Sequence, residues 1–167
     1  LDLACGTGEL LRRIAAETPE AELRGVDLAP AMVKRARGKL AGEGNVQVEQ
    51  ADAHDLPFGD DAFDVIVCAS TFHYFTHPQV VLEEVHRVLR PTGRLVMLDW
   101  CRDYWICRVM DAILRVIDPA HATCYTLDEL TRHLNATGWT ARTAARYRFD
   151  LIWGMMVVEA RSALSDL

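Results

Sequence analysis

Two glycines near the start of the chain, Gly6 and Gly8, follow an apolar run and precede a segment with helical spacing of apolar residues. The run "LDLAC" is typical of the end of a buried strand, so the glycines occupy a tight strand-to-helix turn. Glycine lets the backbone turn sharply and lets a ligand approach it closely. The first N–H groups of the helix are unpaired and lie at its positive dipole end, which favours a polar ligand. A tight turn that binds nothing is the alternative.

Three acidic residues stand on or after the first three predicted strands. Asp27 ends the second strand, where a carboxylate can accept hydrogen bonds from ribose hydroxyls. It could instead cap the helix that begins near Pro30. Asp52 ends the third strand, where a carboxylate suits an amino group such as that of adenine. Asp2 lies within the first strand, and a carboxylate there is costly unless it meets a cation or an N–H donor.

The glycine spacing separates two kinds of nucleotide ligand. A dinucleotide fingerprint requires a third glycine at position 11, counted from Gly6 and Gly8, but the chain has Leu11 there. A pyrophosphate needs that close approach to the backbone, and a leucine side chain argues against it. The sequence therefore favours a ligand with adenosine and no phosphates over a nicotinamide dinucleotide.

A histidine among aromatic residues follows the fourth predicted strand, in the segment "STFHYFTH", residues 70–77. His73 is the best candidate for a general base because imidazole titrates near neutral pH. A histidine that packs beneath the loop is the alternative. Tyr74 and Phe75 could line a pocket, and Trp105, further along, could either line the pocket or pack in a helix core. The candidate acceptor-pocket residues are Phe72, His73, Trp100 and Tyr104. The other histidines are expected in loops, at helix starts or on the surface: His54, His77, His86, His121 and His133.

The elements that position these residues alternate between strand and helix patterns. Strands separated by helices form parallel pairs with right-handed crossovers. Two β-rich runs near the end have only Asp150 and its neighbours between them, which predicts an antiparallel hairpin. The expected strands are residues 1–4, 21–28, 46–52, 63–70, 94–100, 139–149 and 151–161, and the expected helices are residues 8–18, 31–44, 77–93, 103–118 and 126–138. Pro91 and Gly93 are expected to end the third helix, and Thr126 with Glu129 to form a capping box.

Composition narrows the classes of partner. The 167 residues carry a net charge of −6 and no basic stripe, which argues against a nucleic-acid partner. The densest basic run, residues 34–39, is expected to be a solvated helix face. Five cysteines, with no C-x-x-C pair, predict neither disulfides nor a zinc cage, and they favour a reducing, cytoplasmic compartment. No metal site is expected, and no apolar run reaches the ~18 residues that a membrane span requires.

Four stretches together resemble the S-adenosylmethionine-dependent methyltransferases of the Rossmann-like class: "LDLACGTGELL", "GVDLAPAMVKRAR", "QADAHDLPFGDDAFDVIVCASTFHY" and "VLRPTGRLVMLDW". The similarity covers about residues 1–100 and is strongest to the type 11 branch, which includes the ubiquinone and menaquinone biosynthesis methyltransferases. The resemblance implies an α/β fold: a doubly wound, mostly parallel, seven-stranded sheet with a C-terminal antiparallel hairpin and helices on both faces.

The resemblance also implies roles for matching positions. Asp2 and the glycine loop would contact the methionine part of S-adenosylmethionine, Asp27 the ribose hydroxyls, and Asp52 the adenine amino group. Leu28 and Met32 would pack near the adenine. The implied cofactor-binding residues are Asp2, Ala4, Cys5, Gly6, Thr7, Gly8, Asp27, Leu28, Met32, Asp52, Ala53, Cys68 and Ala69. The commonest loop of the family has glycine at the position of Ala4.

The implied reaction is an in-line transfer of a methyl group from S-adenosylmethionine to a small-molecule acceptor, which leaves S-adenosylhomocysteine. A nucleic-acid or protein methyltransferase, a non-catalytic binding domain and a nicotinamide-dependent oxidoreductase are the alternatives. We expect no nucleic-acid partner and a monomer or homodimer. Related enzymes begin with helices before the first strand. We therefore expect residues 1–167 to be a single methyltransferase domain that lacks its N-terminal helix and the start of its first strand.

Overall fold

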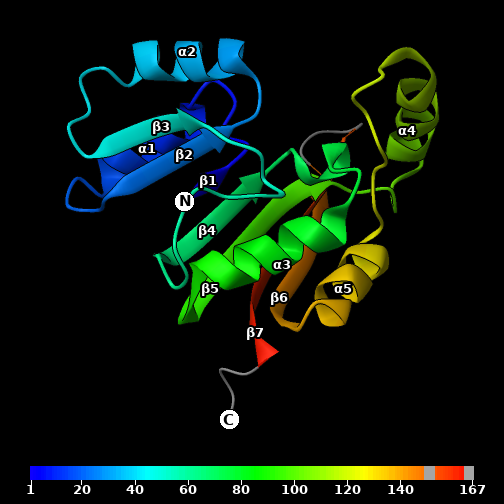
Figure 1. Cartoon of the computed structure of the whole chain (residues 1–167). Helices are drawn as coiled ribbons and strands as arrows, with labels where there is room; N and C mark the ends of the chain where they lie inside the picture. The colour runs from blue at the N-terminus through cyan, green and yellow to red at the C-terminus, as the bar shows by residue number, and fades with distance from the viewer. Residues whose placement is uncertain (149–152, 164–167) are drawn as a thin grey trace.

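The computed structural model describes residues 1–148 and 153–163. Its centre is a seven-stranded sheet in the order β3-β2-β1-β4-β5-β7-β6 (Figure 1). The first five strands of this order run parallel, whereas β7 is antiparallel to both β5 and β6. The strands are Asp2–Leu3 (β1), Leu23–Asp27 (β2), Val46–Gln50 (β3), Phe63–Ala69 (β4), Leu89–Trp100 (β5), Trp139–Arg148 (β6) and Gly154–Ser162 (β7). This order confirms the predicted Rossmann-like sheet and its C-terminal hairpin.

Two hydrophobic clusters hold the helices against the sheet. The helices are Glu9–Glu17 (α1), Pro30–Lys39 (α2), Pro78–Val88 (α3), Trp105–Ile117 (α4) and Leu127–Ala136 (α5), with a short 3₁₀ turn at Phe72–Tyr74 (η1). One cluster joins α1 and α2 to β3 through Leu11, Val33 and Val48. The other packs α3 and α5 against the central strands, and Figure 1 shows α3 crossing in front of β4 and β5. Burial of each large apolar side chain contributes about 1.5–3 kcal/mol to these contacts.

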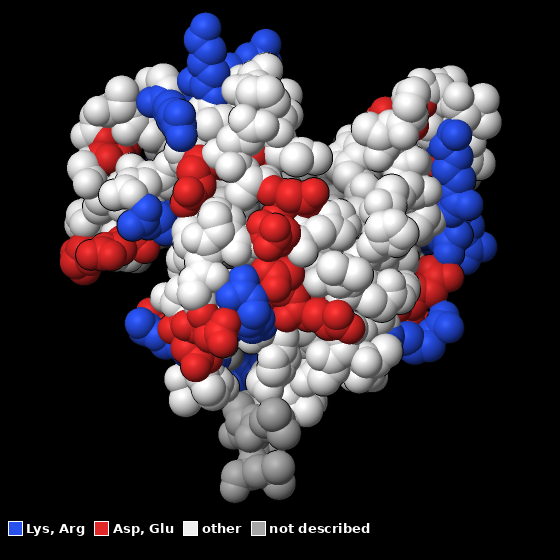
Figure 2. Space-filling view, viewed as in Figure 1, with Lys and Arg blue, Asp and Glu red and all other residues white. Residues whose placement is uncertain are grey.

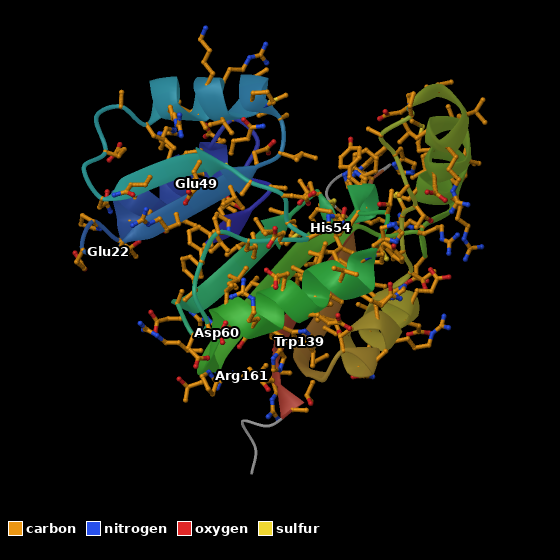
Figure 3. The ribbon with its side chains drawn as sticks, in the orientation of Figure 1. Glu22, Glu49, His54, Asp60, Trp139 and Arg161 are labelled. Atoms are coloured by element: carbon orange, nitrogen blue, oxygen red, sulfur yellow. The ribbon has the colours of Figure 1, made fainter. Side chains whose placement is uncertain are left out.

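The start of β6 is fixed by a buried tryptophan. Trp139, labelled in Figure 3, is 2% exposed, and its indole N–H donates to the carbonyl of Leu82 in α3 at 3.3 Å. The ring also contacts His86 edge to face. β6 then pairs with β7 from Trp139 opposite Ser162 to Arg148 opposite Gly154. The predicted turn at Asp150 lies outside the described residues.

Two predicted helices are too long. The helix expected to reach residue 93 ends at Val88, and Leu89 pairs with Phe63 at the start of β5. Pro91 has no N–H and disfavours helix at the residue before it, so the chain is extended here. The second predicted helix ends at Lys39 rather than residue 44, because the chain turns at Leu40, whose carbonyl accepts the N–H of Glu43.

The helix α4 stands apart from the sheet beyond the end of β5, at the upper right of Figure 1. Only Cys107 and Asp111 of its residues are buried. Of the two alternatives for Trp105, packing in a helix core is therefore wrong, since its side chain is 72% exposed.

Several smaller predictions are confirmed. Thr126 accepts the N–H of Glu129, and the Glu129 carboxylate accepts the N–H of Thr126, so the capping box of α5 is complete. The described cysteines are free and buried. Within residues 1–148 and 153–163, none of the helices combines the length and apolarity needed to cross a bilayer.

Candidate cofactor and acceptor site

The turn after β1 has three residues in the left-handed backbone region. Ala4 has φ 56°, Gly6 φ 55° and Gly8 φ 73°. A Cβ atom on Gly8 would lie 2.9 Å from Leu40 and 3.1 Å from Ala36, so glycine here lets α1 pack against α2. A Cβ on Gly6 would meet nothing within 4 Å. The backbone at Gly6 is therefore open to a ligand, whereas that at Gly8 is closed by the fold.

Asp27 connects the glycine turn to the start of α2. Its Oδ2 accepts the N–H of Gly6 at 2.8 Å, and its Oδ1 accepts the N–H of Ala29 at 2.9 Å. The alternative, that Asp27 caps α2, is wrong, because the N-cap of α2 is Ala29 and no side chain of the described residues caps this helix. Each carboxylate oxygen has a second lone pair, so Asp27 retains acceptor capacity for hydroxyl groups. The same side chain can shape the turn and bind a sugar.

Asp2 is a buried carboxylate in need of a partner. Asp2 is the first residue of β1 and is 3% exposed. The Oδ2 atom has no hydrogen-bond partner among the described residues. Burial raises the pKa of Asp2 to about 7. The Leu1 ammonium opposes this rise in pKa, and the Asp27 carboxylate adds to it. A buried, unpaired carboxylate is costly, so a cationic group of a ligand would stabilise it.

Asp52 follows β3 and holds the histidine two residues later. Its Oδ1 accepts the backbone N–H of His54 at 2.9 Å and lies 2.6 Å from His54 Nδ1. These bonds lower the pKa of Asp52. Figure 3 labels His54 on the segment after β3, and its ring contacts Phe75 and His77. The half-buried His54 departs from the exposed position that we expected.

The other predicted cofactor residues differ in their exposure. Leu28 is 64% exposed directly after Asp27, which leaves an apolar surface available to a flat ring. Ala53 is buried, and Cys68 is buried with its Sγ 3.2 Å from Thr71 Oγ1. Half-buried residues are Ala4, Thr7, Met32 and Ala69, and Cys5 is buried. Except for Met32, which lies in the first turn of α2, these positions lie on the parallel strands or in the turns after them.

His73 belongs to a buried histidine–aspartate pair. Its Nδ1 lies 2.6 Å from Asp99 Oδ1, and its backbone N–H donates to Asp99 Oδ2 at 3.0 Å. In the neutral tautomer that donates from Nδ1 to this carboxylate, Nε2 has a free lone pair. The Nε2 atom has no partner among the residues that the structure describes. The side chain is only 1% exposed, so the pair also fixes η1 against the end of β5.

The aromatic residues predicted around the acceptor fall into two groups. Trp100 stacks on His73 with ring centroids 4.8 Å apart, and Tyr104 is half-buried with Arg148 over its ring. Phe72 is 2% exposed and packs in the main core against Phe75 and Tyr125. The position of Phe72 supports packing, and the half-buried Trp100 and Tyr104 are the ones that a ligand could reach.

Two functional-site features escaped the sequence analysis. Asp99 was not singled out, although strict alternation with Leu95 and Met97 places it on the buried face of β5. His121 was expected on the surface or as a helix cap but is 7% exposed, and its Nε2 lies 2.9 Å from Asp111 Oδ1. The loop before α5 folds back over η1, where the N–H groups of residues 122 and 123 donate to the His73 carbonyl. No local pattern signals such a long-range contact.

A cavity of about 990 Å³ opens mainly at the amino ends of the strands, and its lining also includes Asp2 of the candidate site. Its lining includes Leu23, Phe63 and Arg94, at the amino ends of β2, β4 and the inner part of β5. Ligands of open parallel sheets bind at the carboxyl ends of the strands. The candidate site is therefore the edge with the glycine turn, Asp27, Asp52 and η1.

The sheet order and the turn after β1 define a Rossmann-like methyltransferase fold. The family described as "Methyltransferase domain" matches residues 1–97. The chain belongs to this family of S-adenosylmethionine-dependent methyltransferase domains. It is 45% identical over 101 residues to "Demethylmenaquinone methyltransferase" of Thermus thermophilus, covering 60% of this chain and 46% of that protein. It is 41% identical over 106 residues to "Ubiquinone/menaquinone biosynthesis C-methyltransferase UbiE" of Ectopseudomonas mendocina. This match covers 61% of this chain and 41% of that protein.

Solved structures share the fold over most of the chain. A SAM-dependent methyltransferase from Aquifex aeolicus is 25% identical with a TM-score of 0.78, covering 95% of this chain and 79% of that one. The [4+2]-cyclase SpnF is 18% identical with a TM-score of 0.79, and the match covers 96% of this chain and 73% of that one. The fold alone therefore does not fix the reaction. The chain spans less than half the length of the two curated relatives.

Proposed function

We propose that the protein transfers a methyl group from S-adenosylmethionine to a small aromatic acceptor of the quinone or hydroquinone class. The assignment of the cofactor rests on the structure of the turn after β1. It combines an open backbone at Gly6, a carboxylate bound to that backbone, and the unpaired buried Asp2. The acceptor class is supported by the two curated relatives named above.

The residues present fit the three parts of the cofactor. Asp2 would pair with the ammonium of the methionine part, and the open backbone at Gly6 would leave room for the rest of that part. Asp27 would accept the ribose hydroxyls through its remaining lone pairs, next to the exposed Leu28 side chain. Asp52 is half-exposed with one oxygen free of the His54 bonds, so it can accept an amino group. When bound, the cofactor supplies a methyl group made electrophilic by a sulfonium.

The chain's contribution to the reaction is alignment and proton removal. Holding two reactants in line can supply an effective molarity of ~10⁵–10⁸ M. A hydroquinone carbon becomes a better nucleophile when its neighbouring hydroxyl loses a proton. His73 Nε2 is proposed to accept that proton, with Asp99 stabilising the imidazolium that forms. Trp100, which stacks on His73, and Tyr104, at the start of α4, are proposed to hold the acceptor ring.

Calorimetry with S-adenosylhomocysteine tests the cofactor assignment. We expect the protein to bind it and to give no heat with NADH. Asp27→Asn should weaken binding by about tenfold or more, because a hydrogen bond to a charged acceptor contributes about 1.5–3 kcal/mol. Asp64→Asn, an exposed carboxylate on β4, is the matched control and should bind normally. Binding of NADH in place of the sulfonium product would overturn the assignment.

Turnover with labelled methyl donor tests the base. His73→Gln should lower turnover about 10²-fold or more, while the affinity for S-adenosylhomocysteine stays unchanged. If turnover, affinity and thermal stability all fall together, His73 is a packing residue and the proposed proton transfer is wrong. A panel of hydroquinones, phenols and amines then identifies the acceptor class, and methylation confined to amines would overturn the quinone assignment.

A further inference from the structure

We propose that α4 is a docking helix that lies on the surface of an anionic lipid bilayer. The proposal goes beyond methyl transfer, and it rests on the distribution of side chains on this helix. Five of the nine exposed large hydrophobic residues among the described residues belong to α4: Trp105, Val109, Ile113, Val116 and Ile117. A concentration of this kind marks an interaction surface, whereas scattered exposed apolar residues do not.

The exposed apolar residues form one stripe. Trp105, Val109, Ile113 and Val116 are separated by four, four and three residues, so they share one side of the helix. Val116 is 84% exposed and Trp105 72%. The opposite side holds Cys107 and Asp111, which are buried against the body. The stripe therefore faces away from the contacts that attach α4 to the protein.

The charges on α4 match an anionic surface. Within α4, all of which the structure describes, the charged residues are Arg108, Asp111 and Arg115. Asp111 is buried and paired with Arg115 at 2.8 Å, so only arginines of the helix are exposed. Arg108 and Arg115 are seven residues apart and border the apolar stripe on one side. Figure 2 shows basic side chains gathered along this outer side, at the right of the view.

The neighbouring surface adds Arg132 to the positive region, since Arg102 there is paired with Glu129 at 2.6 Å. A depression of about 420 Å³ between α4 and α5 is lined by Arg102, Arg115 and Arg132, together with Glu129. The whole chain carries a net charge of −6, so the rest of its surface is on balance repelled by anionic lipid. The positive region therefore selects one orientation on a membrane.

An apolar stripe bordered by arginines is the pattern of a helix that lies in the plane of a bilayer interface. The apolar side chains enter the boundary between headgroups and acyl chains, and the arginines meet lipid phosphates. Trp105 suits the interface because its indole combines a large apolar ring system with a polar N–H group. The helix follows Trp100 and Tyr104 directly in the chain, so docking would place the proposed acceptor pocket near the membrane.

Sedimentation with lipid vesicles tests the proposal. We expect the protein to bind vesicles that contain phosphatidylglycerol and to bind phosphatidylcholine vesicles more weakly. Arg108→Gln should weaken binding about fivefold, since one arginine near an anionic surface contributes about 1 kcal/mol. Val109→Asp should weaken it about tenfold or more. Val80→Asp on α3 is the matched control, because Val80 is 43% exposed and Val109 45%, and it should bind normally.

Two further measurements decide between occupants of the surface. The tryptophan emission should shift to shorter wavelength with vesicles, and Trp105→Phe should abolish the shift while the protein still sediments. Lys34→Gln on α2 controls for the other basic region and should change nothing. Equal binding by Val109→Asp and Val80→Asp would overturn the proposal. A lipid-free dimer that Val109→Asp dissociates would assign the stripe to a second copy instead. Vesicle binding without methyl transfer would leave this proposal standing and remove only the proposed function.

Discussion

Ala4 carries a backbone conformation that a glycine would adopt at less cost. Its φ of 56° lies in the left-handed region, which costs an L-residue roughly 1–2 kcal/mol. Glycine would avoid this conformational cost, but its greater loss of conformational entropy on folding would offset about 0.5–1 kcal/mol of the gain. We expect Ala4→Gly to raise the free energy of unfolding by up to about 1 kcal/mol in urea titrations.

An exposed helical alanine provides the contrast for Ala4. Ala16 lies on the exposed side of α1, where the backbone is helical and glycine is unfavourable. Ala16→Gly should lower the free energy of unfolding by about 1 kcal/mol. Equal destabilisation by both substitutions would show that the turn at Ala4 is not strained.

The raised pKa of Asp2 predicts a pH dependence of cofactor binding. With a pKa of about 7, the carboxylate goes from about one-tenth ionised at pH 6 to about nine-tenths at pH 8. Only the ionised form pairs with an ammonium, so affinity for S-adenosylhomocysteine should rise by up to about ninefold over this range. Asp2→Asn should remove the slope, and an unchanged slope in calorimetry would exclude the pairing.

The raised pKa of Asp2 has the opposite effect on the stability of the fold, which falls where affinity for the cofactor rises. Between the ordinary carboxyl pKa near 3.9 and about 7, the folded protein holds a proton on Asp2 that the unfolded chain has lost. The free energy of unfolding therefore falls as pH rises through this window. Asp2→Asn should flatten that fall in denaturant titrations, and Asp64→Asn, an exposed acid, should leave it unchanged.

Residue types and spacing were sufficient to predict part of the site. The strand-end carboxylates and the glycine turn could be read from local sequence, because the topology of parallel strands brings strand ends together. The partners of His73 could not, since Asp99 is twenty-six residues away and the contact depends on how η1 packs. His121 was misplaced for the same reason, as its burial is decided by a loop that folds back.

At the scale of elements, α5 shows how local chemistry sets a helix start. The reciprocal bonds between Thr126 and Glu129 satisfy two backbone N–H groups that the helix leaves unpaired. Thr126→Ala should lower the free energy of unfolding by about 1 kcal/mol. Thr131→Ala, where the hydroxyl only bonds back to the carbonyl of Leu127, should be close to neutral. Equal effects in thermal unfolding would contradict the role of the capping box.

Element types were predicted better than element ends. The strands and helices were recognised because apolar periodicity reports which side is buried. The boundary at Leu89 was missed because the apolar pattern of α3 continues into Leu89, and only its pairing with Phe63 makes it a strand residue. For α4, the pattern predicted a helix correctly but could not show which apolar side would be covered, and Trp105 proved exposed.

At the scale of the whole molecule, the two hydrophobic clusters lie on either side of the glycine turn. Cys5 belongs to the cluster with α1 and α2, and Leu3 to the cluster with α3 and α5. A ligand seated on this turn would therefore stabilise both. We expect S-adenosylhomocysteine at one hundred times its Kd to raise the free energy of unfolding by about 2.7 kcal/mol. A thermal shift absent for this ligand, at concentrations where calorimetry shows saturation, would contradict the expectation.

The position of β7 has a consequence for how the chain is made. The strand β7 follows β6 in the chain but is inserted between β5 and β6, where Val96 pairs with Glu159 and Ala144 with Val158. During translation the side of β5 that β7 will occupy stays open until β7 emerges, because β7 follows both of its neighbours in the chain. A nascent chain halted before residue 154 would present two unpaired strand edges, which invite association with other chains. The segment matched by the family, residues 1–97, thus ends within β5, and the sheet is complete only when β7, Gly154–Ser162, has also emerged.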